Sequence, residues 1–255
     1  MMTFPTRFFL PALVMGMVLA STLTTASAAD KPVPKPGAAI NLPPSADLAY
    51  SIKAKQSGLS LDGDALVQWS TSGKIFTVTT ETRAQLVGKI GEAKSEGVID
   101  AAGLAPLTFI EKRFRKEPTT TTFNRTNNTV NFGGSGASAP LKAGQQDRNS
   151  AIWQLIALAR GTPAAIKVGT EWTFMVAGAN DAEPWTFKVT QQEKIGTRFG
   201  ELATFHVIRK PPPESKGQQL DIWLAPAQEW YPVRLKFVDA DGEFIEQTLE
   251  KISKK

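Results

Sequence analysis

The chain has 255 residues, with 29 Lys and Arg against 24 Asp and Glu, one His, no Cys and a formal net charge of +5. The missing Cys residues exclude thiol nucleophiles and disulfides, and a single His cannot complete the usual three or four ligands of a zinc site. The charge excess is mild and no nucleic-acid motif accompanies it, so it fits a solubilising surface or anionic envelope partners better than nucleic acid.

Residues 1–28 have the three parts of a secretory signal peptide. Arg7 is the only charge before an apolar run from Phe8 to Ala20, and Ala26-Ser27-Ala28 supplies the small residues of a cleavage site. The run is short for a bilayer span, which needs ~20 apolar residues, so cleavage is favoured over an uncleaved anchor. We therefore expect a periplasmic protein that does not span the membrane after signal cleavage and carries no acylated cysteine.

Residues 29–46 follow as a Pro-rich leader, which we expect to be stiff and solvated because proline neither continues a helix nor joins a ladder. Its prolines are Pro32, Pro34, Pro36, Pro43 and Pro44. The remaining residues, 47–255, are expected to form a single β-rich domain, since a chain of this size buries enough surface for one core.

From residue 50 onwards, short β-type segments alternate with turn residues. The pattern predicts strands at 50–55, 65–69, 75–80, 83–90, 94–99, 107–114, 119–125, 129–132, 171–176, 185–193, 202–209, 219–224, 233–238 and 243–251. Asn127-Asn128 predicts a hairpin turn, and Gly133 to Ala143 a flexible loop rather than a phosphate loop.

One segment has helical spacing instead. Ile152, Leu155, Ile156 and Ala159 give one apolar face, which predicts a helix over 148–160 that begins under a cap from Asp147. The fold class that follows is mainly β, a curled antiparallel up-and-down sheet (half-barrel or barrel-like) packing against one amphipathic helix.

Catalytic residues are few. His206 is the only His on which a Ser-His-Asp arrangement could be built, and it lies inside a predicted strand, where a structural role is favoured. Asp62-Gly63-Asp64 and Asp239-Ala240-Asp241-Gly242 are typical of turns. Asp147 and Asp221 remain as candidate carboxylates for hydrolysis of a glycosidic bond, which needs a pair of them.

Ligand binding is the other possibility, because six Trp residues could stack on sugars or line a lipid-sized cavity, although they could equally fill the core. The basic run at Lys112 to Lys116 is expected to be a solvated edge, since alternate residues of a strand point to opposite faces. The candidate ligand-binding residues are Trp153, Trp223, Arg234, Asp147 and Asp221. We expect no cofactor and no metal site.

Three motifs together resemble an exported bacterial family, domain of unknown function 3108. They are Gly103-Leu104-Ala105-Pro106, the stretch Gln146 to Ser150 before the helix, and Trp223-Leu224-Ala225-Pro226 followed by Tyr231-Pro232-Val233-Arg234. The resemblance covers about residues 49–252. It implies a periplasmic β-rich fold around a helix, and it implies no activity and no catalytic residues.

These observations leave three hypotheses. The leading one is a non-enzymatic periplasmic binding or envelope-assembly module for an envelope lipid, glycan or protein. The alternative is a carboxylate-dependent hydrolase acting on envelope glycans. The third is an assembly factor whose exposed edge strands extend a partner's sheet.

Overall fold

The structure is a computed structural model that describes residues 39–56, 58–211 and 217–255. The expected signal peptide, residues 29–38 of the expected leader, and Pro212 and Pro213 lie outside the described residues. Among the described residues, no helix is both long enough and apolar enough to cross a membrane.

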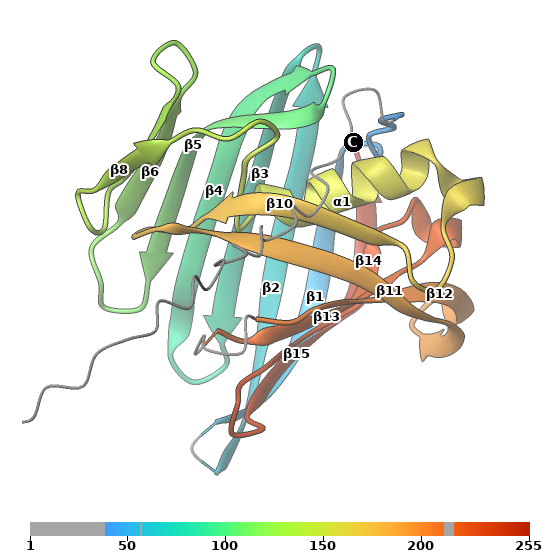
Figure 1. Cartoon of the computed structure of the whole chain (residues 1–255). Coiled ribbons are helices and arrows are strands. Elements are labelled where there is room, and N and C mark those ends of the chain that lie inside the picture. Colours follow the sequence, from blue (N-terminus) through green and yellow to red (C-terminus); the bar gives the residue numbers. More distant parts are fainter. Residues whose placement is uncertain (1–38, 57, 212–216) are drawn as a thin grey trace, which may run out of the picture. The chain divides into compact units, whose positions relative to one another are not determined.

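In the described part of the chain, fifteen strands form one sheet with the order β8-β7-β6-β5-β4-β3-β2-β1-β15-β14-β13-β12-β11-β10-β9 (Figure 1). The strands are β1 (Ala46–Gln56), β2 (Leu59–Ser72), β3 (Ile75–Ala84), β4 (Gly88–Asp100), β5 (Gly103–Arg113), β6 (Thr119–Asn124), β7 (Thr129–Phe132), β8 (Ser138–Pro140), β9 (Gln146–Asp147), β10 (Glu171–Ala177), β11 (Ala182–Thr197), β12 (Gly200–Arg209), β13 (Gln219–Leu224), β14 (Pro232–Val238) and β15 (Phe244–Lys254). All ladders are antiparallel except the short one between β9 and β10. The expected antiparallel, largely up-and-down sheet is confirmed.

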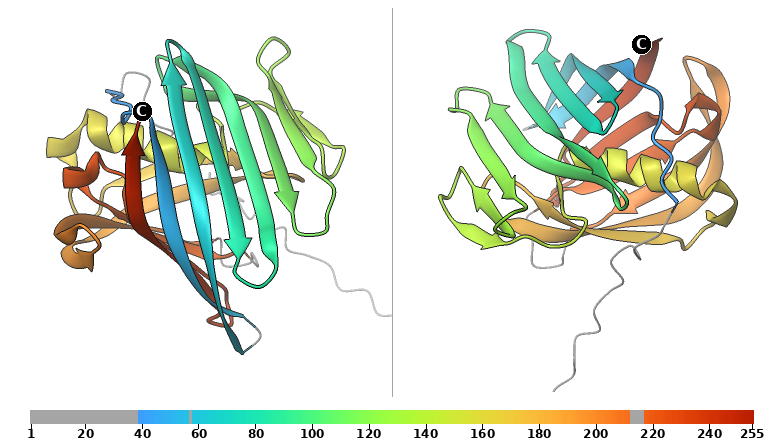
Figure 2. Two further views of the ribbon diagram at one scale, coloured as in Figure 1. Left: turned by 180° about the vertical axis from the view of Figure 1, so that it is seen from behind. Right: turned by 90° about the horizontal axis from the view of Figure 1, so that it is seen from above.

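The first and last strands meet in the middle of the sheet. β1 pairs with β15 from Ala46 opposite Lys254 to Lys55 opposite Phe244, and Figure 2 shows the two strands side by side. The two edge strands, β8 and β9, are instead consecutive in the chain. The sheet therefore curls outwards from its centre in both directions, and within residues 39–56, 58–211 and 217–255 no ladder closes it into a barrel.

Loops link the two ends of the curl where the ladder does not. The Gly134 N–H donates to the Ala179 carbonyl, and the Ser135 hydroxyl donates to the Asn180 carbonyl, each at 2.8 Å. The Thr121 hydroxyl donates to the Gly178 carbonyl at the same distance. We call residues 133–135 and 178–180 the clasp. The glycine-rich segment that was expected to be only a flexible loop thus makes a defined contact and also contains β8.

The helix α1 (Ser150–Gly161) lies inside the curl, and the sheet surrounds it when the molecule is seen from above (Figure 2). Two 3-10 turns, η1 (Pro163–Ala165) and η2 (Pro226–Gln228), complete the elements. Trp153 of α1 stacks on Trp69 of β2 with ring centroids 4.4 Å apart and planes 9° apart. Burial extends beyond the predicted apolar stripe, since nine of the twelve helical residues are buried.

Side chains of the helix and of its approach hold it against β5. Gln154 accepts the Leu104 N–H and donates to the Ala102 carbonyl, both at 2.7 Å. Gln146 donates to the Leu104 carbonyl at 2.7 Å. Gly103 has a φ of +111°, which a side chain would strain, and an added Cβ would collide with the Gln154 amide. The first two sequence motifs therefore meet in one docking contact.

The end of the expected Pro-rich leader packs on the domain. Pro43 is buried, and its carbonyl accepts the indole N–H of Trp69 at 3.0 Å. The Tyr231 hydroxyl donates to the Pro44 carbonyl at 2.6 Å, and β1 begins at Ala46.

Two local predictions are wrong. The segment 83–90 is not one strand, because β3 ends at Ala84 and β4 begins at Gly88, with the exposed Leu86 between them. Asp62-Gly63-Asp64 is not a turn but lies within β2, where a Cβ on Gly63 would come within 2.2 Å of the Arg83 carbonyl oxygen. This Gly is present for close approach of two strands.

Candidate functional site

A cavity of about 470 Å³ lies between the start of α1 and the inner face of the sheet. That volume is within the ~300–1,000 Å³ typical of small-molecule sites. Its lining comes from Tyr50, Val67, Thr80, Arg113, Arg148, Asn149, Ile152, Trp153, Glu183, Trp185, Arg209, Gly217, Gln218, Leu220, Pro232, Leu235, Phe237 and Gln247. Nine strands and the helix contribute lining residues, so the curl of the sheet is what creates the space.

Much of the lining is apolar. Trp153, Leu220 and Leu235 are buried core residues, and Ile152 and Phe237 pack beside them. Tyr50 also lines this wall, and its hydroxyl donates a hydrogen bond to the Pro232 carbonyl at 2.9 Å. Burial, followed by the nearby Tyr231, raises the pKa of Tyr50 well above its ordinary value, so this hydroxyl stays neutral. These surfaces favour an apolar part of a ligand.

A charged group lies at another part of the lining. Arg209, whose side chain is 4% exposed, pairs with Glu183 through Nη2 and Oε1 at 2.6 Å. Its Nη1 donates to the Gln218 carbonyl at 2.8 Å, and its guanidinium stacks over the Trp185 ring at 4.4 Å. The Trp185 indole donates to the same Glu183 oxygen at 2.9 Å. The guanidinium is thus fixed in orientation.

Arg148 is the second guanidinium near this point. Its backbone N–H donates to the Ala177 carbonyl at 3.2 Å, and its side chain lies so close to Gly178 that a Cβ there would be 2.8 Å from the Arg148 Cζ. Burial lowers the pKa of Arg209, Glu183 counteracts this, and the positive charge of Arg148 lowers it further. The two like charges are therefore near enough to repel each other.

Asp147 is fully buried and serves the helix N-terminus. Its Oδ1 accepts the N–H groups of Asn149 and Ser150, each at 2.8 Å, and its own N–H donates to the Ser150 hydroxyl at 3.0 Å. Ser95 donates to Oδ2 at 2.5 Å. Burial raises the pKa of Asp147 to about 6, and these hydrogen bonds oppose the rise. The helix begins two residues later than predicted and its N-cap residue is Asn149, so Asp147 is not the N-cap, although its carboxylate accepts the first N–H groups of the helix start.

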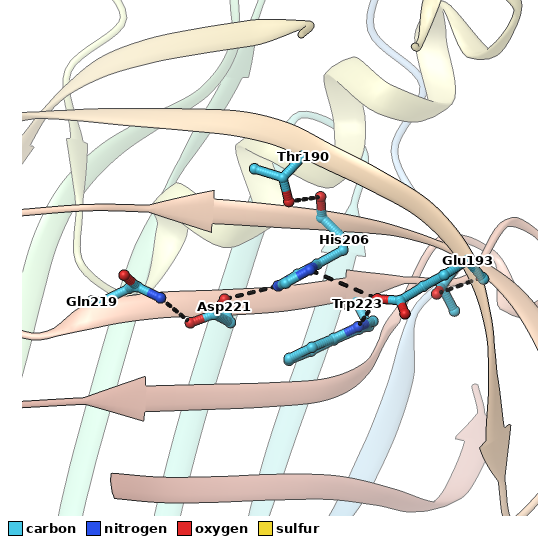
Figure 3. A network of polar contacts seen from close by, with 7 residues as sticks. Thr190, Glu193, His206, Gln219, Asp221 and Trp223 are labelled. Atoms are coloured by element: carbon cyan, nitrogen blue, oxygen red, sulfur yellow. Dashed lines mark hydrogen bonds and ion pairs between the residues drawn. The ribbon is translucent and has the colours of Figure 1, made fainter. Parts of the chain in front are cut away.

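A polar cluster lies on the opposite face of the sheet from the cavity, because Asp221 and Trp223 alternate along β13 with Leu220 and Ile222, which face the core. Figure 3 shows this cluster around His206. Its Nε2 is 2.8 Å from Asp221 Oδ1, and its ring stacks on Trp223 with centroids 4.2 Å apart.

The neighbours of that pair complete the cluster. The Trp223 indole donates to Glu193 at 2.9 Å, and Gln219 donates to Asp221 Oδ2 at 2.7 Å. Arg234 lies over the Trp223 ring at 5.5 Å. Burial raises the pKa of Asp221, but the hydrogen bonds from His206 and Gln219, with the positive charge of Lys236 nearby, together outweigh it, so the pKa is lowered. The predicted residues Asp221, Trp223 and Arg234 thus meet here, away from Trp153 in the cavity and from Asp147 at the helix.

The cavity residues that sequence reasoning missed are Arg148, Glu183, Trp185 and Arg209. Arg148 lies inside a sequence motif but was assigned only to the helix start. Glu183 and Arg209 are 26 residues apart in the chain and meet because β11 and β12 pair. The sequence alone did not show that β11 and β12 pair or in which register, so it could not predict this contact.

The carboxylates do not form a pair in the cavity. Among the described residues that line it, Glu183 is the only carboxylate, and it is bound to Arg209. Elsewhere, the ligand oxygens of Asp239, Asp241 and Glu243 lie within 4.8 Å of one another at the β14–β15 hairpin. The predicted hairpin is confirmed there by the Asp239 N–H, which donates to the Glu243 carbonyl at 2.8 Å.

Comparison with known proteins identifies a family and a fold. A family model described as "Protein of unknown function (DUF3108)" matches residues 49–250. A comparison with curated proteins found no match. A crystal structure of a β-barrel-like protein of the domain of unknown function DUF1849 from Brucella abortus is similar, with a TM-score of 0.58, 14% identity, and coverage of 85% of this chain and 100% of that one.

A second solved structure, of a protein from Bacteroides fragilis described as exported with a YmcC-like fold, has a TM-score of 0.36 and 10% identity. The match covers 85% of this chain and 100% of that one. This TM-score is too low to support an argument. The first match supports the β-barrel-like fold alone.

Proposed function

This chain belongs to the DUF3108 family of proteins of unknown function, and from that premise we propose that it is a periplasmic, non-enzymatic binding protein. The ligand is an envelope molecule with an apolar part, held in the cavity beside α1. The observation that carries the proposal is the cavity itself, about 470 Å³ in volume, with a largely apolar lining inside a curled sheet. Few precisely placed polar groups in an apolar pocket are what small-molecule sites generally show.

The location and domain limits are part of the same proposal. The basic, apolar and small-residue order of residues 1–28 supports cleavage and export, and residues 47–255 would then act as one β-rich domain behind the leader. Of the five residues selected from the sequence, Trp153 is the one that lines the cavity, and we propose it as a direct ligand contact.

Two alternatives have less support. Glycoside hydrolysis needs two carboxyl groups about 5–9.5 Å apart across one cleft, whereas the described lining offers Glu183 alone. Assembly by strand addition needs a usable edge, but the edges β8 and β9 span three and two residues. Short edge strands are a common protection against such pairing.

The proposal is tested by native mass spectrometry of protein purified from periplasm, followed by lipid extraction. We expect a bound amphipathic molecule in the wild type and its loss in Leu235→Trp, which places a larger side chain in the cavity. The matched control is Leu86→Trp, at a position that is 92% exposed. Retention of the molecule by a folded Leu235→Trp protein would contradict the proposal.

A further inference from the structure

Arg209 is a buried charge with one guanidinium nitrogen that lacks a hydrogen-bond partner among the described residues. Its Nη2 donates a hydrogen bond to Glu183 at 2.6 Å, and its Nη1 donates one to the Gln218 carbonyl at 2.8 Å. The nitrogen without a partner is the buried Nε. An unpaired buried donor is costly, and at a cavity wall a ligand can supply the missing acceptor.

The charges of the lining are not balanced. Three guanidinium groups, those of Arg113, Arg148 and Arg209, line the cavity. Arg209 is paired with Glu183, and Arg113 is paired with Glu111 at 2.8 Å. Among the described residues, no carboxylate lies within ion-pair distance of Arg148. One positive charge is therefore left over at the cavity.

The position of Arg148 is fixed by its neighbours. Its backbone N–H donates to the Ala177 carbonyl, and its guanidinium packs where Gly178 leaves room. Arg148 and Arg209 line the same cavity. Two arginines that face one space and repel each other are a common arrangement for binding an anion, because planar guanidinium groups match carboxylate and phosphate oxygens. The apolar wall at Trp153, Leu220 and Leu235 adjoins this space.

We propose that Arg148 and Arg209 form the headgroup subsite of the cavity and that the ligand is an anionic amphiphile, with a singly charged carboxylate or phosphate group at the arginines and an acyl chain against the apolar wall. This inference rests on the proposed cavity function and specifies its ligand. Arg148 supplies the uncompensated charge, while Arg209, held by Glu183 and Trp185, supplies a fixed donor.

The test compares two probes with the same chain, dodecanoate and the neutral dodecanol, below their aggregation concentrations. Binding is followed by the fluorescence of the cavity residues Trp153 and Trp185. We expect dodecanoate to bind the wild type roughly tenfold or more tightly than dodecanol, as charge-assisted hydrogen bonds predict. Arg148→Gln should remove this preference by weakening dodecanoate binding, and Arg148→Lys should restore part of it.

The matched control is Arg198→Gln, because Arg198 is a β11–β12 turn residue with a 73% exposed side chain. It should leave the preference intact. Inorganic phosphate and acetate are titrated as well, to separate a headgroup subsite from a site for free anions. We expect both to bind far more weakly than dodecanoate.

The outcomes separate the two proposals. If neither dodecanol nor dodecanoate binds, the proposed cavity function is wrong. If both bind with equal affinity, or a folded Arg148→Gln protein keeps the preference, the headgroup subsite is wrong and the cavity function stands. Inorganic phosphate that binds as tightly as dodecanoate would also overturn the amphiphile inference.

Discussion

The carboxyl group of Asp147 connects pH to stability, since burial raises its pKa to about 6 from an ordinary value of 3.8. The folded state therefore holds a proton that the unfolded chain releases. Its contribution to stability is complete below about pH 4 and is lost as the pH rises through about 6. The difference of ~2 pKa units corresponds to roughly 3 kcal/mol.

We expect Asp147→Asn to remove this pH dependence. The amide oxygen can still accept the N–H groups of Asn149 and Ser150, and the Ser95 hydroxyl can turn to accept from the amide. Urea unfolding between about pH 3 and 8 should show a free energy of unfolding that falls by ~3 kcal/mol less in the variant than in the wild type. Asp64→Asn, at an exposed position, is the control and should show the same pH dependence as the wild type. If the free energy of unfolding of Asp147→Asn also falls with pH as in the wild type, Asp147 is not the group responsible.

The polar cluster around His206 contributes to stability in a different way, because Asp221 is the hydrogen-bond partner of the His206 ring. Asp221→Ala should leave Nε2 of His206 without its partner and lower the free energy of unfolding by about 1–3 kcal/mol. Asp64→Ala, at an exposed position of β2, should change it by less than ~0.5 kcal/mol. Chemical denaturation at neutral pH distinguishes the two, and equal effects would show that the cluster is not structural.

Single-residue roles were predictable from sequence where the cause is local. The contact of Asp147 with the helix start and the hairpin turn at Asn128, whose φ is +51°, depend on a few adjacent residues. The Arg209–Glu183 pair and the His206–Trp223 stack depend on which strands are neighbours and in what register. Neither follows from alternation along a single strand.

Among the elements, α1 is fixed by Gln154 as well as by its apolar residues. We expect Gln154→Leu to preserve the side-chain volume and leave the Leu104 N–H and the Ala102 carbonyl unpaired. The expected loss is about 2–4 kcal/mol in the free energy of unfolding. Gln192→Leu, at an exposed position of β11, is the control, and an unchanged denaturation midpoint for Gln154→Leu would refute the docking role.

The clasp joins two elements that no ladder connects. Gly134→Ala would place a Cβ 2.3 Å from the Asn180 side-chain oxygen and 2.9 Å from the Ala179 carbonyl. We expect faster amide hydrogen exchange at residues 133–135 and 178–180, with little change at the β1–β15 ladder. Gly196→Ala, which meets nothing within 4 Å, should leave exchange unchanged. Unaltered exchange in Gly134→Ala would show that the clasp adds no local stability.

Element types were largely predictable because β-branched alternation and helical spacing differ clearly. The errors occurred where a local signal had a tertiary cause. Gly63 indicated a turn, but it admits the carbonyl of a neighbouring strand. The segment 83–90 was predicted as one strand, although Leu86 within it is exposed at the turn between β3 and β4. The near-complete burial of α1 follows from a curl that wraps around it.

For the whole molecule, β15 is the strand that joins the two halves of the sheet. A chain that ends after Gly242 would lack it and leave β1 and β14 with unpaired inner edges. We expect such a chain to lose its cooperative thermal transition and to aggregate, because long exposed edges pair with other chains. A wild-type circular dichroism spectrum and melting curve for the truncated chain would contradict this.

The central pairing of β1 with β15 also sets the order in which the chain can fold. The first half of the sheet emerges early from synthesis, but its inner edge finds its partner only when the final residues are available. Contacts between such distant residues form slowly. Under the export route proposed above, this delay would be useful, because the central pairing of the sheet cannot form before β15 has crossed the membrane.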